Sequence, residues 1–560
     1  MDVPLPRGYM KRVDVALIHA PSVYDFRERP YVHYGPISDV IPSKPVFDMY
    51  PAGFFSLASY LEERGVKTGI FNLAAKMVND PRFDVPRFLR SLEASVYGID
   101  LHWLVHAHGA LEIARLVKEL RKGHVVLGGF SATYYWREIL EKFPYVDAIV
   151  LGDTTEPVFF EVVQALEAGR LDKLGEVPNL AYRDENGRVR FNGLRYVPVE
   201  LDELRPKYDI VVKVMVRSGI TYSIPWSTFL KHPVTAVITY KGCTFNCLAC
   251  GGSRFTYNVI YGRRKLGVKK PETLFEEYKE ITERLKAPIF FVNDLQVLGK
   301  SYVERLVSLL RSERAGVEVF FEFFTPPPRD FLAVLRSAEE RVYLQISPET
   351  HDESIRSTYG RPYTNSSLKA FLRNAEDLGF TRVDLYFMVG LPGQTPENVK
   401  GIGSFFEELR RIAPKVVDAF VAPLAPFVDP GSPAFHMSGK YGYRLFAYTL
   451  SDHRKLLLAD KWYLMLNYET RWMTRAEIAA ATYNAVESLA TSKYRAGVID
   501  EEYFREVMES IQLARRGGRP EILDSKETLR EEELYPMKAL NLSYLTPKVI
   551  LEIAKYMVRS

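Results

Sequence analysis

Residues 241–252 read KGCTFNCLACGG and contain Cys243, Cys247 and Cys250, the only cysteines among 560 residues. The apolar run AVITYKG (236–242), which has the composition of a strand, leads directly into them. An odd, clustered set of cysteines argues against an extracellular disulfide framework and favours a metal site in a reducing compartment. The spacing lets three thiolates converge on one side of a tight loop.

Three thiolate ligands are one fewer than a closed structural zinc site requires. His232 precedes the strand and is poorly placed to be the fourth ligand. An iron–sulfur cubane held by three thiolates leaves one iron open to a substrate or cofactor. We favour this open-iron cluster over its two alternatives, a zinc site with a distant fourth ligand and a chance grouping of cysteines.

The run that precedes Cys243 is the first of six strand-like runs separated by amphipathic helical segments. Such a series predicts a partial (β/α) barrel, two strands short of a closed one, with its chemistry at the carboxyl ends of the strands. The six runs are AVITYKG (236–242), IFFVND (289–294), VEVFFEF (317–323), VYLQIS (342–347), RVDLYFMVG (382–390) and VVDAFVAP (416–423).

The N-terminal part of the chain also alternates strands with helices. This alternation predicts a doubly wound parallel sheet, whose ligands lie beyond the carboxyl ends of the strands. The expected strands are VDVALIHA (13–20), VKTGIFNL (66–73), SVYGID (95–100), HVVLGG (124–129) and VDAIVLG (146–152).

Four domains follow from these patterns, in an α/β chain whose first domain is Rossmann-like. Residues 171–235 break the rhythm and form a linker with a small hairpin that turns at Asn186-Gly187. After residue 436 the strand signals stop, which predicts a helical C-terminal domain. The domains are 1–170 (Rossmann-like), 171–235 (linker), 236–436 (partial barrel) and 437–560 (helical).

Cys-x3-Cys-x2-Cys after the first strand of a six-stranded β/α barrel resembles the radical S-adenosylmethionine (SAM) superfamily. The resemblance implies a 4Fe–4S cluster whose open iron binds the amino and carboxylate groups of SAM. Reductive cleavage then gives methionine and a 5′-deoxyadenosyl radical that takes a hydrogen atom from an unactivated carbon. One departure is Ala249, since the family commonly has an aromatic residue there.

Three later strand ends resemble the segments with which that superfamily contacts SAM. Charge complementarity suits a carboxylate and an amide to the SAM ammonium group. Each segment also has a purely structural alternative, because a Gly-Pro-Gly stretch is often only a turn and a strand-terminal Asp only a helix cap. The residues expected to bind SAM are Asn293, Asp294, Ser347, Glu349, Gly390, Pro392 and Gly393.

The first domain, taken with the second, resembles the cobalamin-binding radical SAM enzymes over roughly residues 10–435, and within them an archaeal subgroup with lipid-modifying members. Glycines there let the backbone approach a flat macrocycle. The Asp-x-His-x-x-Gly signature, which supplies a histidine ligand to cobalamin in this family, does not follow the first strand. We therefore expect base-off cobalamin without a histidine ligand. The alternative is a domain that keeps the fold without the cofactor. The residues expected to line the cobalamin site are Gly53, Asp100, Gly128, Gly129, Phe130, Gly152 and Asp153.

This resemblance implies either carbon–carbon ring closure or methyl transfer to an unactivated carbon. By analogy the sharpest hypothesis is cyclopentane-ring formation in tetraether membrane lipids, similar to a GDGT ring synthase, with a C-methyltransferase acting on a lipid or small molecule as the alternative. Aromatic residues around Trp462, Tyr468 and Met473 are most simply part of a core, and the alternative is closure over an apolar chain. A methylthiotransferase would need a second cluster, for which no cysteines remain, and a non-enzymatic regulator would not need the SAM segments.

Composition and charge are those of a globular protein, with 47% hydrophobic residues, 26% charged residues and a formal net charge of +4. No apolar run reaches the ~18 residues of a membrane span, and the N-terminus lacks the apolar core of a signal peptide. We therefore expect a cytoplasmic enzyme, with peripheral membrane contact if the substrate is a lipid. We expect no nucleic-acid partner, and an electron donor such as ferredoxin or flavodoxin.

Overall fold

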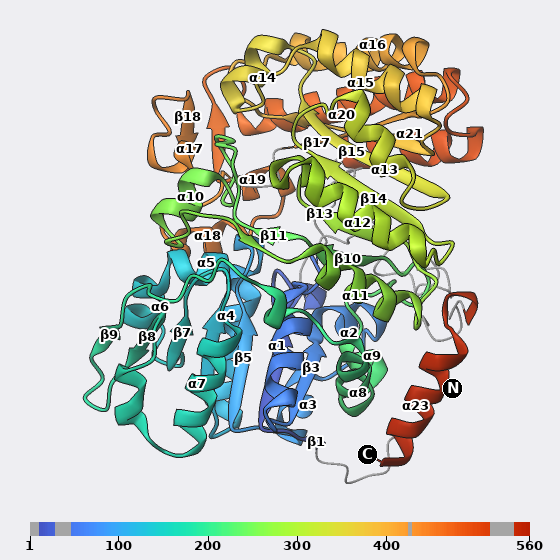
Figure 1. The fold of residues 1–560 in the computed structure, drawn as a ribbon. Coiled ribbons are helices and arrows are strands. Elements are labelled where there is room, and N and C mark those ends of the chain that lie inside the picture. The colour runs from blue at the N-terminus through green and yellow to red at the C-terminus, as the bar shows by residue number, and fades with distance from the viewer. Residues whose placement is uncertain (1–10, 29–45, 424–427, 516–541, 560) are drawn as a thin grey trace.

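The structure is a computed structural model that describes residues 11–28, 46–423, 428–515 and 542–559. Two mainly parallel sheets organise it, and they lie one above the other in Figure 1. The sheet of the N-terminal domain is drawn in blue and teal, and the second sheet in green to orange. The α/β architecture expected from the sequence is therefore confirmed.

The first sheet has seven strands in the order β3-β2-β5-β6-β7-β8-β9. Its five parallel strands are the five that the sequence predicted, and nearly all of their residues are buried. They read as continuous apolar runs because helices cover both faces of the sheet: α1 (Gly53–Glu63) and α7 (Glu156–Glu167) on one, α4 (Ala107–Leu120) on the other. The five strands are β2 (Val15–His19), β3 (Thr68–Asn72), β5 (Val96–Asp100), β6 (His124–Gly128) and β7 (Ala148–Val150).

An antiparallel hairpin, β8 (Leu180–Arg183) and β9 (Val189–Phe191), extends the edge of this sheet. Its turn contains Gly187 at φ +73°, which agrees with the expected Asn-Gly turn. The sheet of the first domain therefore continues to Phe191, beyond the boundary at residue 170, and the irregular linker begins after it.

The second sheet has six strands, all parallel and in chain order, so the expected partial barrel is confirmed. Burial alternates along β13 and β14, because one side packs under helices and the other faces an interior space. The strands are β10 (Thr235–Ile238), β13 (Ile289–Val292), β14 (Glu318–Phe323), β15 (Arg341–Glu349), β16 (Arg382–Val389) and β17 (Val417–Pro423). The helices that follow them are α11 (Pro271–Thr282), α12 (Lys300–Ser312), α13 (Arg329–Arg336), α15 (Asn365–Leu378) and α16 (Pro396–Ile412).

The C-terminal region is mainly helical, and a short antiparallel pair, β18 (Tyr443–Leu445) and β19 (Tyr468–Thr470), interrupts its helices. Its longest helix, α20 (Arg475–Arg495), packs against α16 and β17. The described residues contain no helix with the length and apolar character to cross a bilayer.

The C-terminal helix α23 (Pro547–Arg559) lies beside α8 (Tyr208–Ser218), as Figure 1 shows. An ion pair of 2.8 Å between Arg284 Nη2 and Glu552 Oε1 fixes it to the helical layer of the second sheet. Residues that are far apart in the chain therefore form one wall beside both domains.

Gly109, in the first turn of α4, permits the close approach of this helix to the loop after β2. A Cβ atom at this position would lie 1.8 Å from the carbonyl oxygen of Pro21. We expect Gly109→Ala to lower the free energy of unfolding by about 1–3 kcal/mol, since the helix must move away from the loop. Thermal unfolding measures this change. Gly439→Ala is the matched control, because a Cβ there meets nothing within 4 Å, and equal melting temperatures of the two variants would contradict the packing argument.

Candidate functional site

The cysteine loop follows β11 (Tyr240–Lys241) and is seated on the end of α14 (Glu353–Tyr359). The Leu248 N–H donates to the carbonyl oxygen of Tyr359 at 2.9 Å. Gly360 follows at φ +116°, where an added Cβ would lie 2.8 Å from the Asn246 carbonyl oxygen and 3.0 Å from Cys247 Cα. Only glycine fits both the conformation and the contact, so α14 fixes the shape of the loop.

All three cysteines are free thiols, and Cys247 is buried. Backbone N–H groups donate to two of the sulfurs, from Phe245 to Cys243 Sγ at 3.4 Å and from Gly252 to Cys250 Sγ at 3.3 Å. Burial raises the pKa of Cys247 to about 11 and the pKa values of the other two thiols as well. A thiolate here therefore needs a bound metal to compensate its charge. Among the described residues, no three His, Cys, Asp or Glu side chains gather tightly enough to hold a single metal ion.

Asn293 and Asp294, after β13, are both held by neighbouring strands. Asn293 has φ +82° and donates from Nδ2 to the carbonyl oxygen of Tyr240 at 2.6 Å. The Asp294 carboxylate accepts from the N–H groups of Gln296 and Phe324, each at 2.9 Å. Asp294 thus caps a helical turn, which is the structural alternative for this residue, and its contact with SAM stays a prediction.

Glu322, near the end of β14, is a half-buried carboxyl group that the sequence analysis missed. It accepts from the backbone N–H of Asn293 at 2.9 Å, and loss of hydration raises its pKa. Two acids among apolar residues, as in this strand, carry no distinctive signal. Only the pairing of β13 with β14 shows that this acid lies beside Asn293.

Glu349 and Arg361 form a buried pair beside the cysteine loop. Arg361 Nε donates to Glu349 Oε1 at 3.3 Å, while Glu349 Oε2 and Arg361 Nη1 are buried without a partner. Glu349 has φ +65° after an irregularity in β15, and the Arg361 guanidinium lies 4.4 Å from the centre of the Phe324 ring. An unsatisfied donor next to an unsatisfied acceptor suits a ligand with both carboxylate and ammonium groups. Ser347, two residues before Glu349, is half-buried.

The turn of Gly390, Pro392 and Gly393 is closed by Gln394. Its Oε1 accepts from the N–H groups of Gly390 and Leu391, each at 2.9 Å, and its Nε2 donates to the Met388 carbonyl oxygen at 2.9 Å. Gly390, at φ +100°, lies so near Tyr468 that an added Cβ would be 2.6 Å from the tyrosine Oη. These glycines are needed for packing, whatever they contact in addition.

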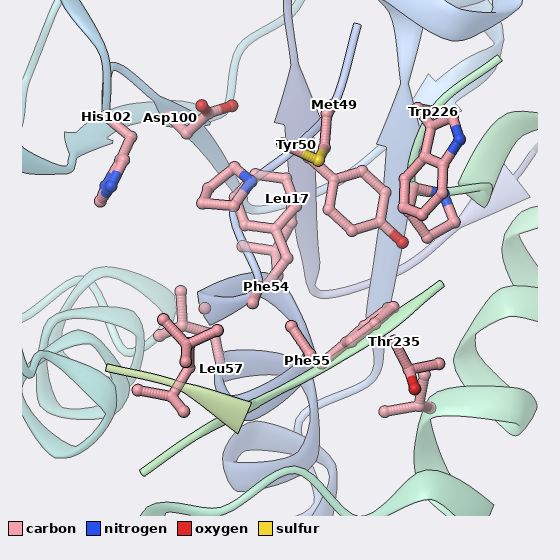
Figure 2. Close-up of a pocket in the computed structure, with 18 of the residues that line it drawn as sticks. Leu17, Met49, Tyr50, Phe54, Phe55, Leu57, Asp100, His102, Trp226 and Thr235 are labelled. Carbon is pink, nitrogen blue, oxygen red and sulfur yellow. The ribbon is translucent and has the colours of Figure 1, made fainter. Parts of the chain in front are cut away.

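A cavity of about 840 Å³ lies between the two domains. From the second domain, Tyr240, Lys241, Asn293 and Gln345 line it. Figure 2 shows its lining, with Asp100 and His102 at one end. All seven residues expected at the cobalamin site line this one cavity: Gly53, Asp100, Gly128, Gly129, Phe130, Gly152 and Asp153.

The seven residues contribute in different ways. Gly53 and Gly128 leave space, since an added Cβ would meet nothing within 4 Å at Gly53 and only the Val150 carbonyl oxygen, at 3.8 Å, at Gly128. Gly129 is needed for packing, because its Cβ would lie 2.6 Å from His102 Cα. The Phe130 ring stacks against His102 and Tyr261, each at 4.6 Å between centroids, and the Asp153 carboxylate pairs with Arg263.

His19, at the end of β2, is a site residue that sequence reasoning missed. Its Nδ1 lies 2.8 Å from Asp100 Oδ1 and its Nε2 3.2 Å from the Phe47 carbonyl oxygen, so both ring nitrogens face acceptors. Burial opposes a charge on the ring, but the Asp100 carboxylate outweighs burial and raises the pKa of His19. We infer an imidazolium–carboxylate pair at the edge of the cavity. Asp100 Oδ2 has no partner.

The aromatic region around Trp462, Tyr468 and Met473 is buried in the main core and does not line the cavity. The core interpretation is therefore confirmed, and the alternative, closure over a substrate, is wrong. His102 lines the cavity, and burial lowers its pKa to about 4, which keeps its imidazole neutral.

Comparisons with known proteins agree with the two-domain reading. The model of the radical SAM superfamily matches residues 237–406, and that of the B12 binding domain matches residues 39–158. An uncharacterised methyltransferase of Pyrococcus horikoshii is 26% identical over 369 residues, 64% of this chain and 73% of that protein. An anaerobic magnesium-protoporphyrin IX monomethyl ester cyclase of Rubrivivax gelatinosus is 23% identical over 363 residues, 62% of this chain and 60% of that protein.

Solved structures share the fold at low sequence identity. The radical SAM methyltransferase TsrM of Kitasatospora setae, with tryptophan and a SAM analogue bound, superposes with a TM-score of 0.57 at 14% identity, over 90% of this chain and 99% of that one. The cobalamin-dependent SAM radical enzyme OxsB, with aqua-cobalamin and SAM bound, gives 0.55 at 14% identity, over 98% and 84%. The order and arrangement of the domains are therefore those of known cobalamin radical SAM folds.

Arg361 is expected to bind SAM through its unpartnered Nη1. Arg361→Met should weaken SAM binding by about 10- to 100-fold, the effect of losing a hydrogen bond to a charged group. Equilibrium dialysis of the cluster-loaded protein measures this affinity, and the cluster absorbance should stay unchanged. Arg373→Met, at an exposed position on α15, is the control. Wild-type SAM affinity in the Arg361 variant would remove this residue from the site.

Gly128 is expected to leave room for cobalamin. Gly128→Leu fills part of the cavity without a backbone clash, and should weaken cobalamin binding roughly tenfold or more while the melting temperature holds. Titration followed by visible absorption measures the affinity, and the spectrum of the bound form tests the base-off state. Gly439→Leu is the matched control. Unchanged cobalamin affinity would show that the cofactor lies elsewhere.

Three observations converge at this site. Three thiols follow the first strand of a six-stranded parallel half-barrel. Seven residues expected to bind cofactor in the preceding domain line a cavity that residues of the half-barrel also line. Both domain models match at these positions. The cofactors of these two domain families are a 4Fe–4S cluster, SAM and cobalamin, and the donor set fits them. The chain is therefore a radical SAM enzyme that carries an N-terminal B12-binding domain.

Proposed function

We propose that the protein is a cobalamin-dependent C-methyltransferase that acts on an unactivated carbon of an apolar small molecule. The observation that carries the proposal is the continuous cavity, which joins the glycine-lined edge of the first sheet to Asn293 and Gln345 of the half-barrel. A substrate in this space would reach both cofactors. The methyltransferase of Pyrococcus horikoshii and the TsrM fold support methyl transfer over ring closure.

The overall reaction balances with two molecules of SAM and two electrons. One SAM gives its methyl group to the substrate carbon and leaves as S-adenosylhomocysteine. The other is reduced to methionine and a deoxyadenosyl group, which takes the hydrogen atom from the substrate and leaves as 5′-deoxyadenosine. Ferredoxin or flavodoxin would supply the electrons, which neutralise the two sulfonium charges.

The chain's own residues bind, orient and shield the reactants. Cys243, Cys247 and Cys250 would hold the cluster, which supplies the electron for SAM cleavage. Glu349 and Arg361 would hold the amino-acid group of SAM, and Glu322 orients Asn293 through its backbone N–H. The apolar lining of the cavity excludes water that would compete for reactive species.

Ring closure is the second candidate, because two of the relatives are cyclases. Cyclopentane formation in archaeal tetraether lipids remains a hypothesis that rests on analogy. It would remove two hydrogen atoms from the substrate and add no carbon. Contact with a membrane surface belongs to the same hypothesis, since such a substrate would be drawn from a bilayer.

Methyl transfer is tested with SAM that carries a deuterated methyl group. Anaerobically reconstituted protein is incubated with reductant, cobalamin and a lipid extract, and products are analysed by mass spectrometry. We expect 5′-deoxyadenosine, S-adenosylhomocysteine and a product that carries the deuterated methyl group. Cys247→Ala should form neither nucleoside product above background, whereas Thr244→Ala, at an exposed position on the same loop, should keep activity.

Two outcomes would contradict the proposal. A product two hydrogens lighter than its substrate, with no label, would establish ring closure instead. Deoxyadenosine that forms equally in the Cys247 variant would exclude the cysteine loop as the origin of the radical.

A further inference from the structure

The cavity continues beyond the residues expected to hold cobalamin. Figure 2 shows Asp100 and His102 at one end, Tyr50, Phe54 and Phe55 between, and Trp226 and Thr235 at the other end. We call the far part the apolar branch. It is lined by Val216, Ile220, Trp226, Phe229, Leu285 and Val549.

Segments from distant parts of the chain build the apolar branch. Val216 lies on α8, Trp226 and Phe229 in the irregular segment before β10, and Val549 on α23. Trp226 and Phe229 form a small buried cluster, against which Ile220 and Leu285 pack. The wall is therefore a tertiary feature, closed by the last helix of the chain.

The charged side chains nearest the branch are already neutralised. Arg284, which lines the cavity, donates from Nε and Nη2 to the two Glu552 carboxylate oxygens at 2.9 and 2.8 Å, and from Nη1 to the Glu280 carbonyl oxygen. Arg382, where the cavity meets the half-barrel, pairs with Asp384. A charged group in the branch would lose its hydration without compensation, which disfavours an ionic ligand.

Trp226 belongs to this apolar wall. Its side chain is 5% exposed, and its Nε1 atom is inaccessible. The accessible part of the side chain is therefore carbon, so the branch suits an apolar chain.

We propose that the apolar branch binds the aliphatic chain of the substrate, which packs against its uncharged wall. The inference rests on the proposed function, in which cofactors and substrate share the cavity. It adds a substrate class, an amphiphile with a long saturated or branched chain, and a location for the chain that is separate from cobalamin.

Chain length provides a quantitative test. Each methylene that enters an apolar site gains about 0.8 kcal/mol, so affinity should rise about fourfold per carbon until the branch is full. N-alkyl dansylamides of increasing alkyl length, which carry no charge, report binding by fluorescence and require neither cluster nor turnover. We expect this rise in the cobalamin-loaded protein, and little binding of N-methyl dansylamide, which lacks the chain.

Variants locate the chain. Val216→Trp should fill the branch and weaken the longest probe about tenfold or more, whereas Asp209→Trp, at an exposed position on the same helix, should leave affinity unchanged. Cobalamin titration and thermal unfolding confirm that each variant is folded.

Several results would overturn the inference. These are affinity independent of chain length, equal binding by the wild type and Val216→Trp, or loss of cobalamin in Val216→Trp, which would show that the cofactor itself fills the branch. Probe binding without deoxyadenosine formation would reject the proposed function and leave the apolar site standing. Deoxyadenosine formation without chain-dependent probe binding would reject the apolar site and leave the proposed function standing.

Discussion

The arrangement of the two domains depends on a buried ion pair between Arg263 and Asp153. Both side chains are nearly inaccessible, and Arg263 Nη1 also donates to the Pro198 carbonyl oxygen at 2.8 Å. Lys241, beside the cysteine loop, donates to the Asp153 carbonyl oxygen at 2.8 Å. The loop after β7 is thereby tied to the segment that carries the cysteines, and Lys241 and Asn293 of the half-barrel face the same cavity as the edge of the first sheet. Loss of one partner would leave an uncompensated buried charge, so this contact is costly to break.

Around the cysteine loop, protein charges are held by the backbone rather than by solvent. The Asp294 carboxylate caps a helical turn, and the Glu322 carboxylate accepts from the Asn293 N–H. The Glu349 carboxylate accepts from Arg361, which lies beside Cys247. Such fixed groups need no rearrangement when a charged ligand arrives, which is the condition for binding SAM in one orientation. The two unsatisfied atoms of the Glu349–Arg361 pair are where we propose that this ligand binds.

The two ends of the cavity differ in polarity. One end is formed by glycines and by Asp100, which His19 holds from behind, and the other by aliphatic and aromatic side chains closed by α23. Polar and spacious at one end and apolar at the other, it suits a large cofactor beside an apolar substrate. This division connects the proposed methyl transfer to a substrate class, and it does not depend on the identity of any relative.

The sequence by itself determined the two strand series, the hairpin at Gly187 and the cysteine loop. These signals are local, because apolar periodicity, turn residues and cysteine spacing all lie in neighbouring positions. The seven residues that line the cavity edge came from the resemblance of their loops to a known family. Composition alone could not decide the cluster around Trp462, which suits both a core and a substrate cover and packs in the core.

Only the tertiary structure decided which buried polar groups meet. His19 and Asp100 are 81 residues apart, Arg284 and Glu552 are 268 apart, and Glu322 reaches Asn293 only through strand pairing. No local pattern encodes such contacts, because a charge becomes a partner only when folding has removed the water around it. The Glu349–Arg361 pair and the cavity wall that α23 completes likewise depend on which surfaces folding brings together.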